Sequence, residues 1–370
     1  MKNKRNNLLL LIVALLVMSL MVIAGCDKEK VVDTPPDSTR IITDMAGREV
    51  TLPAEINRIA TLGPVPVINS LIFSVGEGDK IVNGLPEFAR NGRWKYQYKF
   101  APNITNQPMV QMSTGKPNVE ELLKLKPDVV FTMGTKKAWD EQRIKILAEA
   151  GLPTIHLVWT NPEEVKQAIN LVGQVLNQET RAREYIKYFD DTVIRINDVV
   201  KSIPKNEQPR VLHCNTQNMT APHAISDWWI KQAGGISVTE EFRKETHIAE
   251  NIEFSVEQLL KWNPQVIIVG SPDQVDSLFN DTRFRNISAV KNRRVFASPM
   301  GAQEWCYRTA EQPLMLLWAA KTFHPEAFKD LNLEEELKYF YKNFFNYSMS
   351  VEEVQEVLDG GPKVEPGKKK

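Results

Sequence analysis

The sequence lacks the common motifs of nucleotide-dependent and hydrolytic enzymes. In 370 residues it contains no Gly-x-Ser-x-Gly, no P-loop and no Gly-x-Gly-x-x-Gly, the short motifs that place a nucleophile or cradle phosphates. None of the five histidines is paired at i,i+4 as in a helical zinc site. His213 follows three strand-like residues and is interpreted as a packed core residue. We therefore expect a protein that is not an enzyme and that carries neither a metal nor a cofactor.

The sequence also lacks a charge excess, a disulfide framework and a second long apolar segment. Lys and Arg number 46 against 46 Asp and Glu, and this balance argues against nucleic acid as a partner. Of the three cysteines, Cys26 follows the N-terminal apolar segment. The remaining two, Cys214 and Cys306, fit either one disulfide or two free thiols. Beyond residue 25 no apolar run is long enough to cross a bilayer.

The N-terminus has the pattern of an export signal. Three basic residues precede an apolar stretch over residues 8–23, which leads into the tetrapeptide Ile23-Ala24-Gly25-Cys26. This tetrapeptide resembles a bacterial lipobox, in which the cysteine is diacylated and becomes the mature N-terminus. Two acyl chains give stable membrane attachment. The sequence therefore predicts a lipoprotein signal peptide over residues 1–25 and a lipid anchor at Cys26, on the extracytoplasmic face of the cell membrane.

A fourteen-residue helix–strand segment occurs twice. NVEELLKLKPDVVF, which begins at Asn118, returns as SVEQLLKWNPQVII, which begins at Ser255, and seven of the fourteen aligned positions are identical. Asn118 and Ser255 are good N-caps, and a proline is expected to end each helix. The expected apolar helix face includes Leu123 in one copy and Leu260 in the other. The apolar run that follows is typical of a strand buried in a parallel sheet, so two copies predict two similar α/β lobes.

Each copy carries a glutamate in the first turn of its helix. Glu120 and Glu257 lie outside the expected apolar face. In a parallel α/β lobe the helices begin at the carboxyl edge of the sheet, where open α/β folds bind ligands. A carboxylate at a helix start also stabilises the helix dipole. The matching placement in both lobes nevertheless favours a shared docking function on the rim of the cleft.

These patterns predict an α/β fold of two Rossmann-like lobes with parallel sheets, joined by one long rigid α-helix, with a ligand cleft between the lobes. The expected parts are a flexible tether at 26–40, an N-terminal α/β lobe at 41–160, bridging helices at 161–205, a C-terminal α/β lobe at 206–360 and a flexible tail at 361–370.

Within the bridging region, apolar residues repeat every three to four positions over residues 179–203, which predicts one helix about 37 Å long. Residues 237–251 are expected to be irregular, and residues 334–345 and 351–358 are expected to form peripheral helices.

Two loops carry aromatic and cationic side chains. They cover residues 85–117 and 300–309. Long irregular loops are usually functional, and such side chains suit an anionic or conjugated ligand, although a surface loop without function is the alternative for the first of them. The predicted ligand-binding residues, from these loops and from the ends of expected strands, are Arg90, Arg93, Trp94, Trp159, Asn215, Trp305, Tyr307 and Arg308.

Taken together, these segments resemble a known family. The lipobox, ITDMAGREVTLPAEINRIATL, both copies of the repeat, the long helix and VKNRRVFASPMGAQEW resemble the substrate-binding lipoproteins of bacterial ABC importers. The resemblance covers roughly residues 41–347. It is greatest to the single-helix-linked group for ferric siderophores, haem and cobalamin, which has a molybdate or tungstate branch.

The resemblance implies partners and docking residues but not a ligand. It implies a permease dimer with its ATPase, and one docking glutamate per lobe, which matches Glu120 and Glu257. The family's ligand contacts follow little fixed pattern, so the identity of the ligand does not transfer.

Several functions stay open at this point. The aromatic loops favour a receptor for an iron complex of siderophore or haem type. A molybdate or tungstate oxyanion would need only helix N-termini and one or two arginines, and cobalamin belongs to the same class of importers. A chelatase-like enzyme is the remote alternative. A lipobox and a tether suit a protein that captures a ligand at a membrane better than they suit such an enzyme. We expect a monomer that binds no nucleic acid.

Replacing the lipobox cysteine tests the predicted anchor. We expect Cys26→Ser to release the protein from the membrane fraction or to leave its precursor uncleaved, because the serine cannot carry the thioether-linked lipid. Cell fractionation and lipid labelling measure this outcome. A variant that is still labelled and membrane-bound would show that the anchor lies elsewhere.

Overall fold

The computed structural model describes residues 38–134, 138–248 and 250–363. From Arg40 onward the chain forms one compact unit. The predicted signal peptide, Cys26, most of the predicted tether and residues 364–370 lie outside the described residues. Within the part that is described, every helix is too short or too polar to cross a bilayer. Cys214 and Cys306 are buried free thiols, so the alternative without a disulfide is the one observed.

The first sheet has three parallel strands, and all of their residues are buried, as predicted for strands covered on both faces. In spatial order they are β3 (Ile59–Leu62), β4 (Val129–Met133) and β5 (Thr154–Leu157). A separate two-stranded hairpin consists of β1 (Thr39–Thr43) and β2 (Glu49–Pro53). Its turn lies beside β5, where the backbone N–H of Met45 donates to the carbonyl oxygen of His156 at 3.2 Å. Ile81 adds one isolated parallel bridge to Ile59 at the other side of β3.

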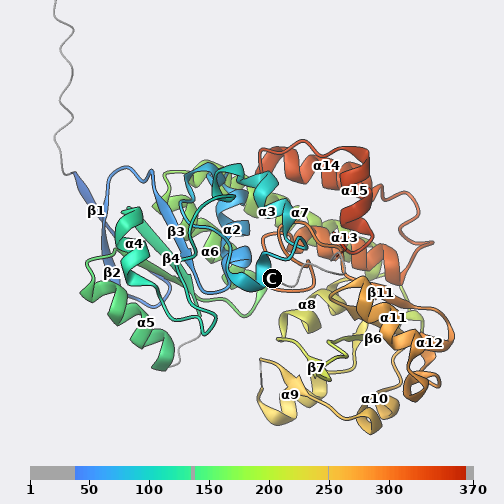
Figure 1. Ribbon diagram of the computed structural model, residues 1–370. Coiled ribbons are helices and arrows are strands. Elements are labelled where there is room, and N and C mark those ends of the chain that lie inside the picture. The colour runs from blue at the N-terminus through green and yellow to red at the C-terminus, as the bar shows by residue number, and fades with distance from the viewer. Residues whose placement is uncertain (1–37, 135–137, 249, 364–370) are drawn as a thin grey trace, which may run out of the picture. The chain divides into compact units, whose positions relative to one another are not determined.

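The second sheet has four parallel strands and a small antiparallel pair beside it. In spatial order the four are β11 (Val295–Ala297), β10 (Val266–Val269), β6 (Arg210–His213) and β8 (Ile236–Ser237). The pair is β7 (Thr220–Ala221) with β9 (Ile252–Glu253). Two parallel sheets confirm the predicted pair of α/β lobes (Figure 1).

Helices surround both sheets. Those before residue 205 are α2 (Val65–Ser74), α3 (Lys95–Phe100), α4 (Val119–Leu125), α5 (Ala138–Glu149), α6 (Pro162–Val175) and α7 (Glu179–Val200). Those after it are α8 (Ile225–Gln232), α9 (Glu240–Thr246), α10 (Val256–Trp262), α11 (Pro272–Asn280), α12 (Ser288–Lys291), α13 (Gln312–Phe323), α14 (Leu333–Phe344) and α15 (Val351–Leu358). The segment 237–251, expected to be irregular, therefore contains α9, and the loop 85–117 contains α3.

Short 3-10 turns complete the chain. They are η1 (Gly78–Lys80), η2 (Glu87–Ala89), η3 (Pro102–Ile104), η4 (Lys205–Glu207) and η5 (Thr282–Phe284).

The repeated segment folds the same way in both lobes. Asn118 accepts the backbone N–H three residues later at 3.3 Å, and Ser255 does the same at 3.1 Å. The ends of the two helices differ from the expectation. Lys126 and Asn263, which precede the prolines, adopt left-handed backbone with φ of 46° and 41°, so each helix ends in a left-handed cap and not through extended geometry.

The exposure of the leucines also differs from the expectation. Leu122 and Leu259 are fully buried, but Leu123 and Leu260 are 49% and 42% exposed. Each helix is short and its buried face is narrow, so only one of two consecutive leucines reaches the core.

The helix α7 connects the lobes and packs on helices of both. It contacts α2 and α6 on one side and α8 and α13 on the other, and at 22 residues it is about 33 Å long. One hydrophobic cluster includes Ile68 of α2, Tyr185 of α7, Leu314 of α13 and Phe340 of α14, all fully buried. The core is therefore shared across the connection.

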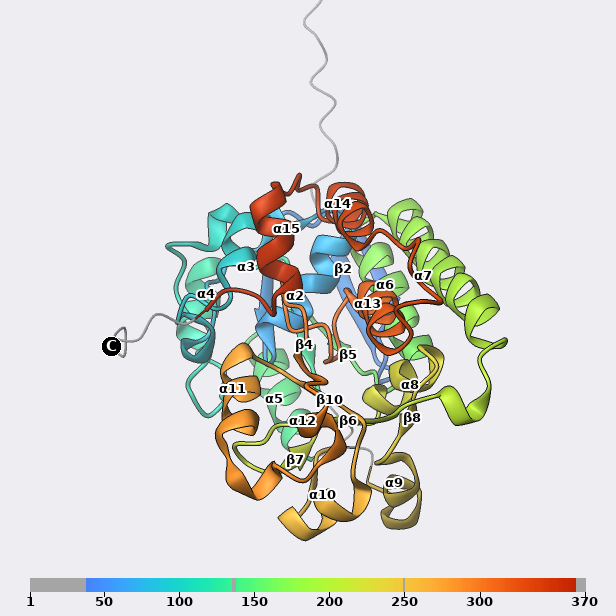
Figure 2. The ribbon, with the colours of Figure 1, turned by 90° about the vertical axis from the view of Figure 1, so that its right-hand side faces the viewer.

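The C-terminal helices are not peripheral, contrary to the expectation. The helix α15 lies beside α3 (Figure 2). The rings of Tyr341 on α14 and Phe100 on α3 stack with centres 5.3 Å apart, and the Tyr96 hydroxyl donates to the Glu356 carboxylate of α15 at 2.6 Å. The end of the chain thus packs against the helices of the first lobe, which a local sequence pattern does not reveal.

This packing makes a test of lobe motion possible. Because α7 and the shared core join the lobes, we expect their angle to change by only a few degrees on ligand binding. Small-angle scattering with and without ligand measures the change. A decrease in the radius of gyration like that of hinge-type binding proteins would contradict a rigid connection.

Candidate functional site

The candidate site lies where the carboxyl ends of the two sheets meet. Trp159 follows β5 of the first sheet, and His213 ends β6 of the second. Arg308, on the loop between β11 and α13, donates from Nη1 to the carbonyl oxygen of Trp159 at 3.2 Å. This bond brings the two lobes together at the position where α/β folds bind ligands.

Two buried histidines flank the ring of Tyr307 here. The rings of His213 and His223 lie 5.5 and 5.7 Å from it, centre to centre, and His213 Nδ1 is 2.6 Å from the hydroxyl of Ser226. We call His213, His223, Tyr307, Arg308 and Trp159 the histidine cluster.

Three nitrogens of the histidine cluster are buried without a hydrogen-bond partner among the described residues. They are Nε2 of His213, Nδ1 of His223 and Nε1 of Trp159. A buried polar atom without a partner costs roughly 1–3 kcal/mol, and native structures contain few of them. Their concentration at the junction of the lobes makes this place a candidate for a bound molecule that supplies hydrogen-bond partners.

Burial keeps both imidazoles neutral. It lowers the pKa of His213 to about 3, with a further contribution from Arg243. The pKa of His223 is lowered well below its ordinary value, first by burial and then by Arg308, His213 and Arg243. A neutral imidazole has one N–H donor. Burial also raises the pKa of Tyr307, which keeps its hydroxyl protonated. The cluster thus offers uncharged donors beside the Arg308 cation.

Arg243, on α9, hydrogen-bonds to both loops that border the cluster. Its guanidinium donates to the carbonyl oxygens of Ala221 and Pro222 on one loop, and to those of Ile248 and Glu250 on the other. The first loop leads into His223, and the second carries the carboxylate that pairs with Arg308.

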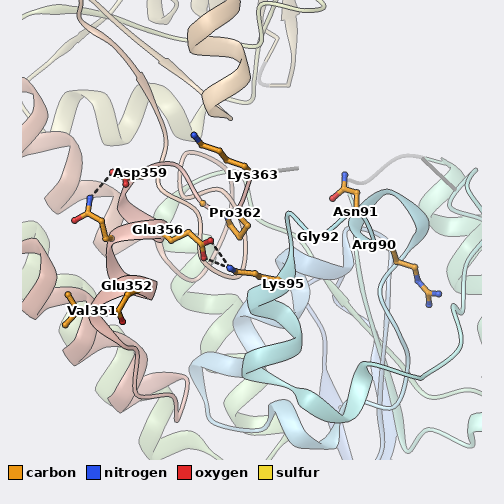
Figure 3. Close-up of a pocket in the computed structure, with 12 residues that line it drawn as sticks. Arg90, Asn91, Gly92, Lys95, Val351, Glu352, Glu356, Asp359, Pro362 and Lys363 are labelled. Carbon is orange, nitrogen blue, oxygen red and sulfur yellow. Dashed lines mark hydrogen bonds and ion pairs between the residues drawn. The ribbon is translucent and has the colours of Figure 1, made fainter. Parts of the chain in front are cut away.

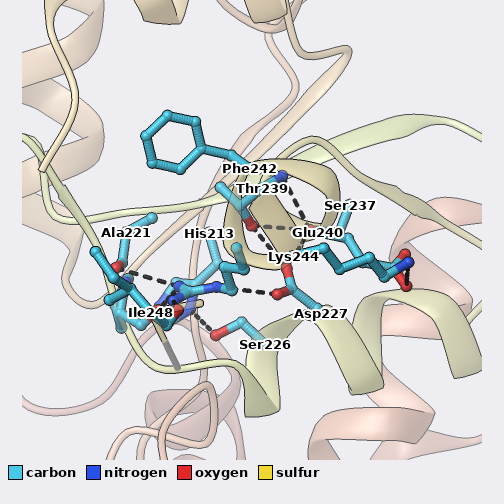
Figure 4. A network of polar contacts seen from close by, with 12 residues as sticks. His213, Ala221, Ser226, Asp227, Ser237, Thr239, Glu240, Phe242, Lys244 and Ile248 are labelled. Atoms are coloured by element: carbon cyan, nitrogen blue, oxygen red, sulfur yellow. Dashed lines mark hydrogen bonds and ion pairs between the residues drawn. The ribbon is translucent and has the colours of Figure 1, made fainter. Parts of the chain in front are cut away.

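Asp227 in turn holds Arg243. One carboxylate oxygen lies 3.0 Å from Nε of Arg243, and the other accepts the hydroxyls of Ser237 and Thr239 (Figure 4). Each of these side chains is buried, so the guanidinium has a fixed position. Asp227 and Arg243 therefore position the loops of the site, and their charges compensate each other.

Arg308 has a weaker acidic partner. Its two terminal nitrogens lie 3.3 and 3.4 Å from the carboxylate oxygens of Glu250, both at the long end of the hydrogen-bond range. The Arg308 side chain is 17% exposed and that of Glu250 37%. An anion that enters the cluster can therefore take the place of this carboxylate at modest cost.

A fully buried carboxylate, Glu311, shapes the loop that carries Tyr307 and Arg308. Its oxygens accept four hydrogen bonds, from the backbone N–H groups of Ala302 and Gln303 and the hydroxyls of Thr309 and Tyr341. A Cβ at Gly301 would collide with the Tyr341 hydroxyl and with Glu311 itself. Only glycine fits this turn.

Arg93, predicted to contact the ligand, also links the lobes. It donates to the carbonyl oxygens of Gly270 at 2.6 Å and Gly360 at 3.1 Å, and its Nη2 lies 3.3 Å from Glu304. Its side chain is only 7% exposed. These contacts use its donors for protein groups at the end of β10 and after α15.

The predicted aromatic residues are mostly buried. Trp159 and Trp305 have no exposed surface. Trp94 is half-buried and donates from Nε1 to Gln303 at 2.7 Å. Their rings therefore offer no open face on which a flat ligand could stack in this structure.

Asn215 and Arg90 make local contacts. The side chain of Asn215 accepts the backbone N–H of Gln217 at 2.9 Å, a turn-forming bond. Arg90 is exposed and donates to the carbonyl oxygen of Leu85 at 2.8 Å. The structure thus unites Trp159, Tyr307 and Arg308, and the ligand contacts of all eight residues remain predictions.

Arg90 borders a second candidate space, a groove of about 1050 Å³ between the loop before α3 and α15 (Figure 3). Its charged side chains include Arg90, Lys95 and Lys363 on the basic side and Glu352, Glu356 and Asp359 on the acidic side. Lys95 and Glu356 already pair at 2.7 Å. Part of the charge of the groove is thus internally compensated.

The two predicted docking glutamates lie on the first turns of α4 and α10, and both are exposed. Lys124, 2.8 Å away, lowers the pKa of Glu120, and the hydroxyl of Ser255 lowers that of Glu257. Both are therefore ionised and accessible at neutral pH. Their docking function stays a prediction.

Sequence reasoning selected Trp159, Tyr307 and Arg308 but not the two histidines of the cluster. His213 was interpreted as a packed residue, and His223, Arg243 and Glu250 were not selected. One sequence signal could have identified His213 as a site residue: it ends a predicted buried strand, at the edge of the sheet where α/β folds bind ligands. Within the described residues, no group of three or more His, Cys, Asp or Glu side chains could hold a metal ion.

Comparison with known proteins gives a consistent result. Residues 72–300 match the periplasmic binding protein family. The molybdate-binding protein MolA of Haemophilus influenzae is 27% identical over 84% of this chain and 92% of its own length. The ABC transporter substrate-binding lipoprotein YvrC of Bacillus subtilis is 21% identical over 69% and 76%. The haem uptake protein IsdE of Staphylococcus aureus is 27% identical over 63% and 77%.

Solved structures agree with these relatives. A periplasmic solute-binding protein from Veillonella parvula superposes with a TM-score of 0.73 at 26% identity, over 86% of this chain and 96% of its own. MolA bound to molybdate superposes with a TM-score of 0.72 at 26% identity, over 84% and 99%. These matches confirm the predicted two-lobe fold.

The buried histidines predict a pH dependence of stability. Their folded pKa values lie below the unfolded value of about 6.5, so the unfolded chain binds protons that the folded chain does not. Stability is then fully present above that value and is lost as pH falls, by up to about 1.4 kcal/mol per pH unit and histidine. Chemical denaturation between neutral pH and about pH 5 measures this loss.

The matched variant is His213→Asn with His223→Asn. Its baseline stability can differ, but its dependence on pH over the same range should be flatter than that of the wild type. Equal slopes would mean that other groups cause the acid sensitivity.

Proposed function

Because the chain belongs to the periplasmic binding protein family and is thereby a solute-binding protein of an ABC importer, we propose that it captures a small oxyanion of the molybdate or tungstate type. The proposed binding place is the histidine cluster. The cargo is then delivered to the importer's permease on the extracytoplasmic side.

The observation that carries this proposal is the set of three unpartnered nitrogens. A tetrahedral oxyanion has several acceptor oxygens. The indole N–H of Trp159 is a donor, and Nε2 of His213 and Nδ1 of His223 are donors in the tautomers that carry the proton on these atoms. Donors buried in a low-dielectric site interact more strongly with an anion than they would in water. A cation would find an unfavourable environment beside Arg308 and Arg243.

Arg308 supplies the charge that a dianion needs. Its long contacts with Glu250 can be replaced by shorter, charge-assisted hydrogen bonds to the ligand. Asp227 keeps Arg243 compensated throughout, so Arg243 serves to hold the loops. The similarity to MolA, named for molybdate and alike over nearly its whole length, supports the same class of ligand.

An iron complex of siderophore or haem type is the second candidate. The groove beside α15 favours it, because about 1050 Å³ accommodates an organic chelate, and its lining of three basic and three acidic side chains offers polar contacts. The relative IsdE is named for haem uptake. Against this candidate stands the burial of Trp159 and Trp305, the side chains on which an aromatic ligand was expected to stack.

The remaining parts of the proposal concern attachment and delivery. The lipid anchor at Cys26 is supported by the lipobox and by the relative YvrC, which is named a lipoprotein. Glu120 and Glu257 are proposed to dock onto cations of the permease dimer. The protein is proposed to act as a monomer.

Two arginine variants distinguish the two ligands. If an oxyanion binds in the histidine cluster, Arg308→Ala should weaken its binding by roughly 1.5–3 kcal/mol, which is tenfold or more, because a desolvated charge-assisted hydrogen bond is lost. Arg90→Ala, at the groove, should leave it unchanged. Titration calorimetry with molybdate, tungstate, sulfate, a ferric siderophore and haem gives the affinities.

The reverse result, loss of chelate binding in Arg90→Ala and full binding in Arg308→Ala, would place the ligand in the groove. Trp305→Ala is not an informative probe, because removal of a fully buried tryptophan should destabilise the fold by about 3–5 kcal/mol.

The double variant Glu120→Ala with Glu257→Ala tests delivery. Both side chains are exposed, so ligand affinity and thermal stability should stay nearly unchanged while uptake and stimulation of the transporter's ATPase decrease. Each single variant should lie in between. High salt should reduce uptake and ATPase stimulation by the wild-type protein toward the level of the double variant, because salt screens exposed charges.

The control for this test is Glu184→Ala, which removes an exposed glutamate from α7. It should transport like the wild type. Normal transport by the double variant would leave the two glutamates as charges that stabilise helix starts.

A further inference from the structure

The two copies of the repeat expose a leucine at the same aligned position. Leu123 on α4 is 49% exposed and Leu260 on α10 is 42% exposed. The leucine immediately before each is fully buried and fixes the orientation of the helix. An apolar side chain is therefore exposed to solvent twice, once from each lobe.

A single exposed leucine is ordinary on a protein surface. Recurrence on two helices with equivalent N-caps and equivalent left-handed C-caps is a different observation. Each leucine also lies three residues after the exposed glutamate of its helix, and side chains at that spacing are neighbours on one face. Both helices thus present a carboxylate beside an apolar group.

We propose that Glu120 with Leu123, and Glu257 with Leu260, form two equivalent docking patches for the extracytoplasmic surface of a two-subunit permease. Each permease subunit would offer a basic side chain next to an apolar pocket that receives the leucine. This inference rests on the proposed delivery function and adds to it an apolar contact, which the glutamates alone would not require.

Charge and duplication select this partner. A carboxylate in each patch requires a cation opposite, and two similar patches on two lobes require a partner with two similar surfaces. A second copy of this chain would bring carboxylates against carboxylates. In the first patch Lys124 already pairs with Glu120 at 2.8 Å, an exposed contact worth little, so a cation of the permease can replace it.

The carboxylates and the leucines of the two patches are expected to respond differently to salt. Attraction between exposed charges is screened over about 8 Å at physiological ionic strength, whereas the burial of leucine is not. The carboxylates would therefore mainly set the rate and orientation of encounter, and the leucines would set how long the complex lasts. Burying the exposed half of one leucine corresponds to about a tenfold change in affinity.

Binding of the purified protein to its transporter in lipid nanodiscs tests this inference. We expect Leu123→Gln and Leu260→Gln each to weaken the complex about tenfold, mainly through faster dissociation, at both low and high salt. The double variant should lose more than either single one. Glu120→Gln with Glu257→Gln should lose affinity at low salt only. Ligand affinity and thermal stability should stay at wild-type level in all of them.

Ile194→Gln is the matched control, because Ile194 is 58% exposed on α7, outside both patches. It should bind the transporter like the wild type. Full affinity of the leucine variants together with a loss in the glutamate variants would overturn the apolar contact and leave charge docking intact. Leucine variants that change self-association of this chain and not transporter binding would also overturn it. A wild-type protein that neither binds nor stimulates the transporter would instead refute the proposed function itself.

Discussion

The four hydrogen bonds to the buried Glu311 carboxylate are the constraint on which the candidate site depends. They fold the segment after β11 back on itself, join it to Tyr341 of α14, and leave Tyr307 and Arg308 directed at the histidines. Burial raises the pKa of Glu311, and the four donors oppose that shift. Such a network is favourable only when every member is satisfied. The network also requires glycine at position 301, because a Cβ there would collide with Tyr341 and Glu311.

The same segment fastens one lobe to the other. The Ser70 hydroxyl of α2 accepts the backbone N–H of Ala310 at 3.0 Å, and Gln97 of α3 donates to the carbonyl oxygen of Ala302 at 2.8 Å. Arg93 adds its bonds to the end of β10. With α7 alongside, these contacts hold the halves of the histidine cluster in place before a ligand arrives. A preformed site loses less entropy on binding than one that must close, which fits a protein whose lobes are joined by a helix.

The sequence was sufficient to predict the parts of the fold that rest on local signals. The caps at Asn118 and Ser255, the buried strands that follow and the long helix α7 all appear where periodicity and capping chemistry place them. Tyr307 and Arg308, which the sequence also pointed to, lie where the carboxyl ends of the two sheets meet, and their contacts with a ligand remain predictions. The failures are of another kind. Tyr341 and Glu356 lie on helices whose partners, Phe100 and Tyr96, are more than two hundred residues away, and no local pattern reports such a contact.

The sequence by itself determined two parallel α/β lobes, the helix between them and the repeated glutamates, because each depends on the spacing of apolar and capping residues within a few turns of chain. Only the tertiary structure decided which side chains share the cleft. It turned Arg93 into a link between lobes, buried Trp159 and Trp305, and assembled His213 and His223 around Tyr307. The physical reason is that hydrogen-bond satisfaction and burial are properties of three-dimensional neighbours. The sequence does not distinguish a histidine whose nitrogens are hydrogen-bonded to protein groups from one whose nitrogens are left for a ligand.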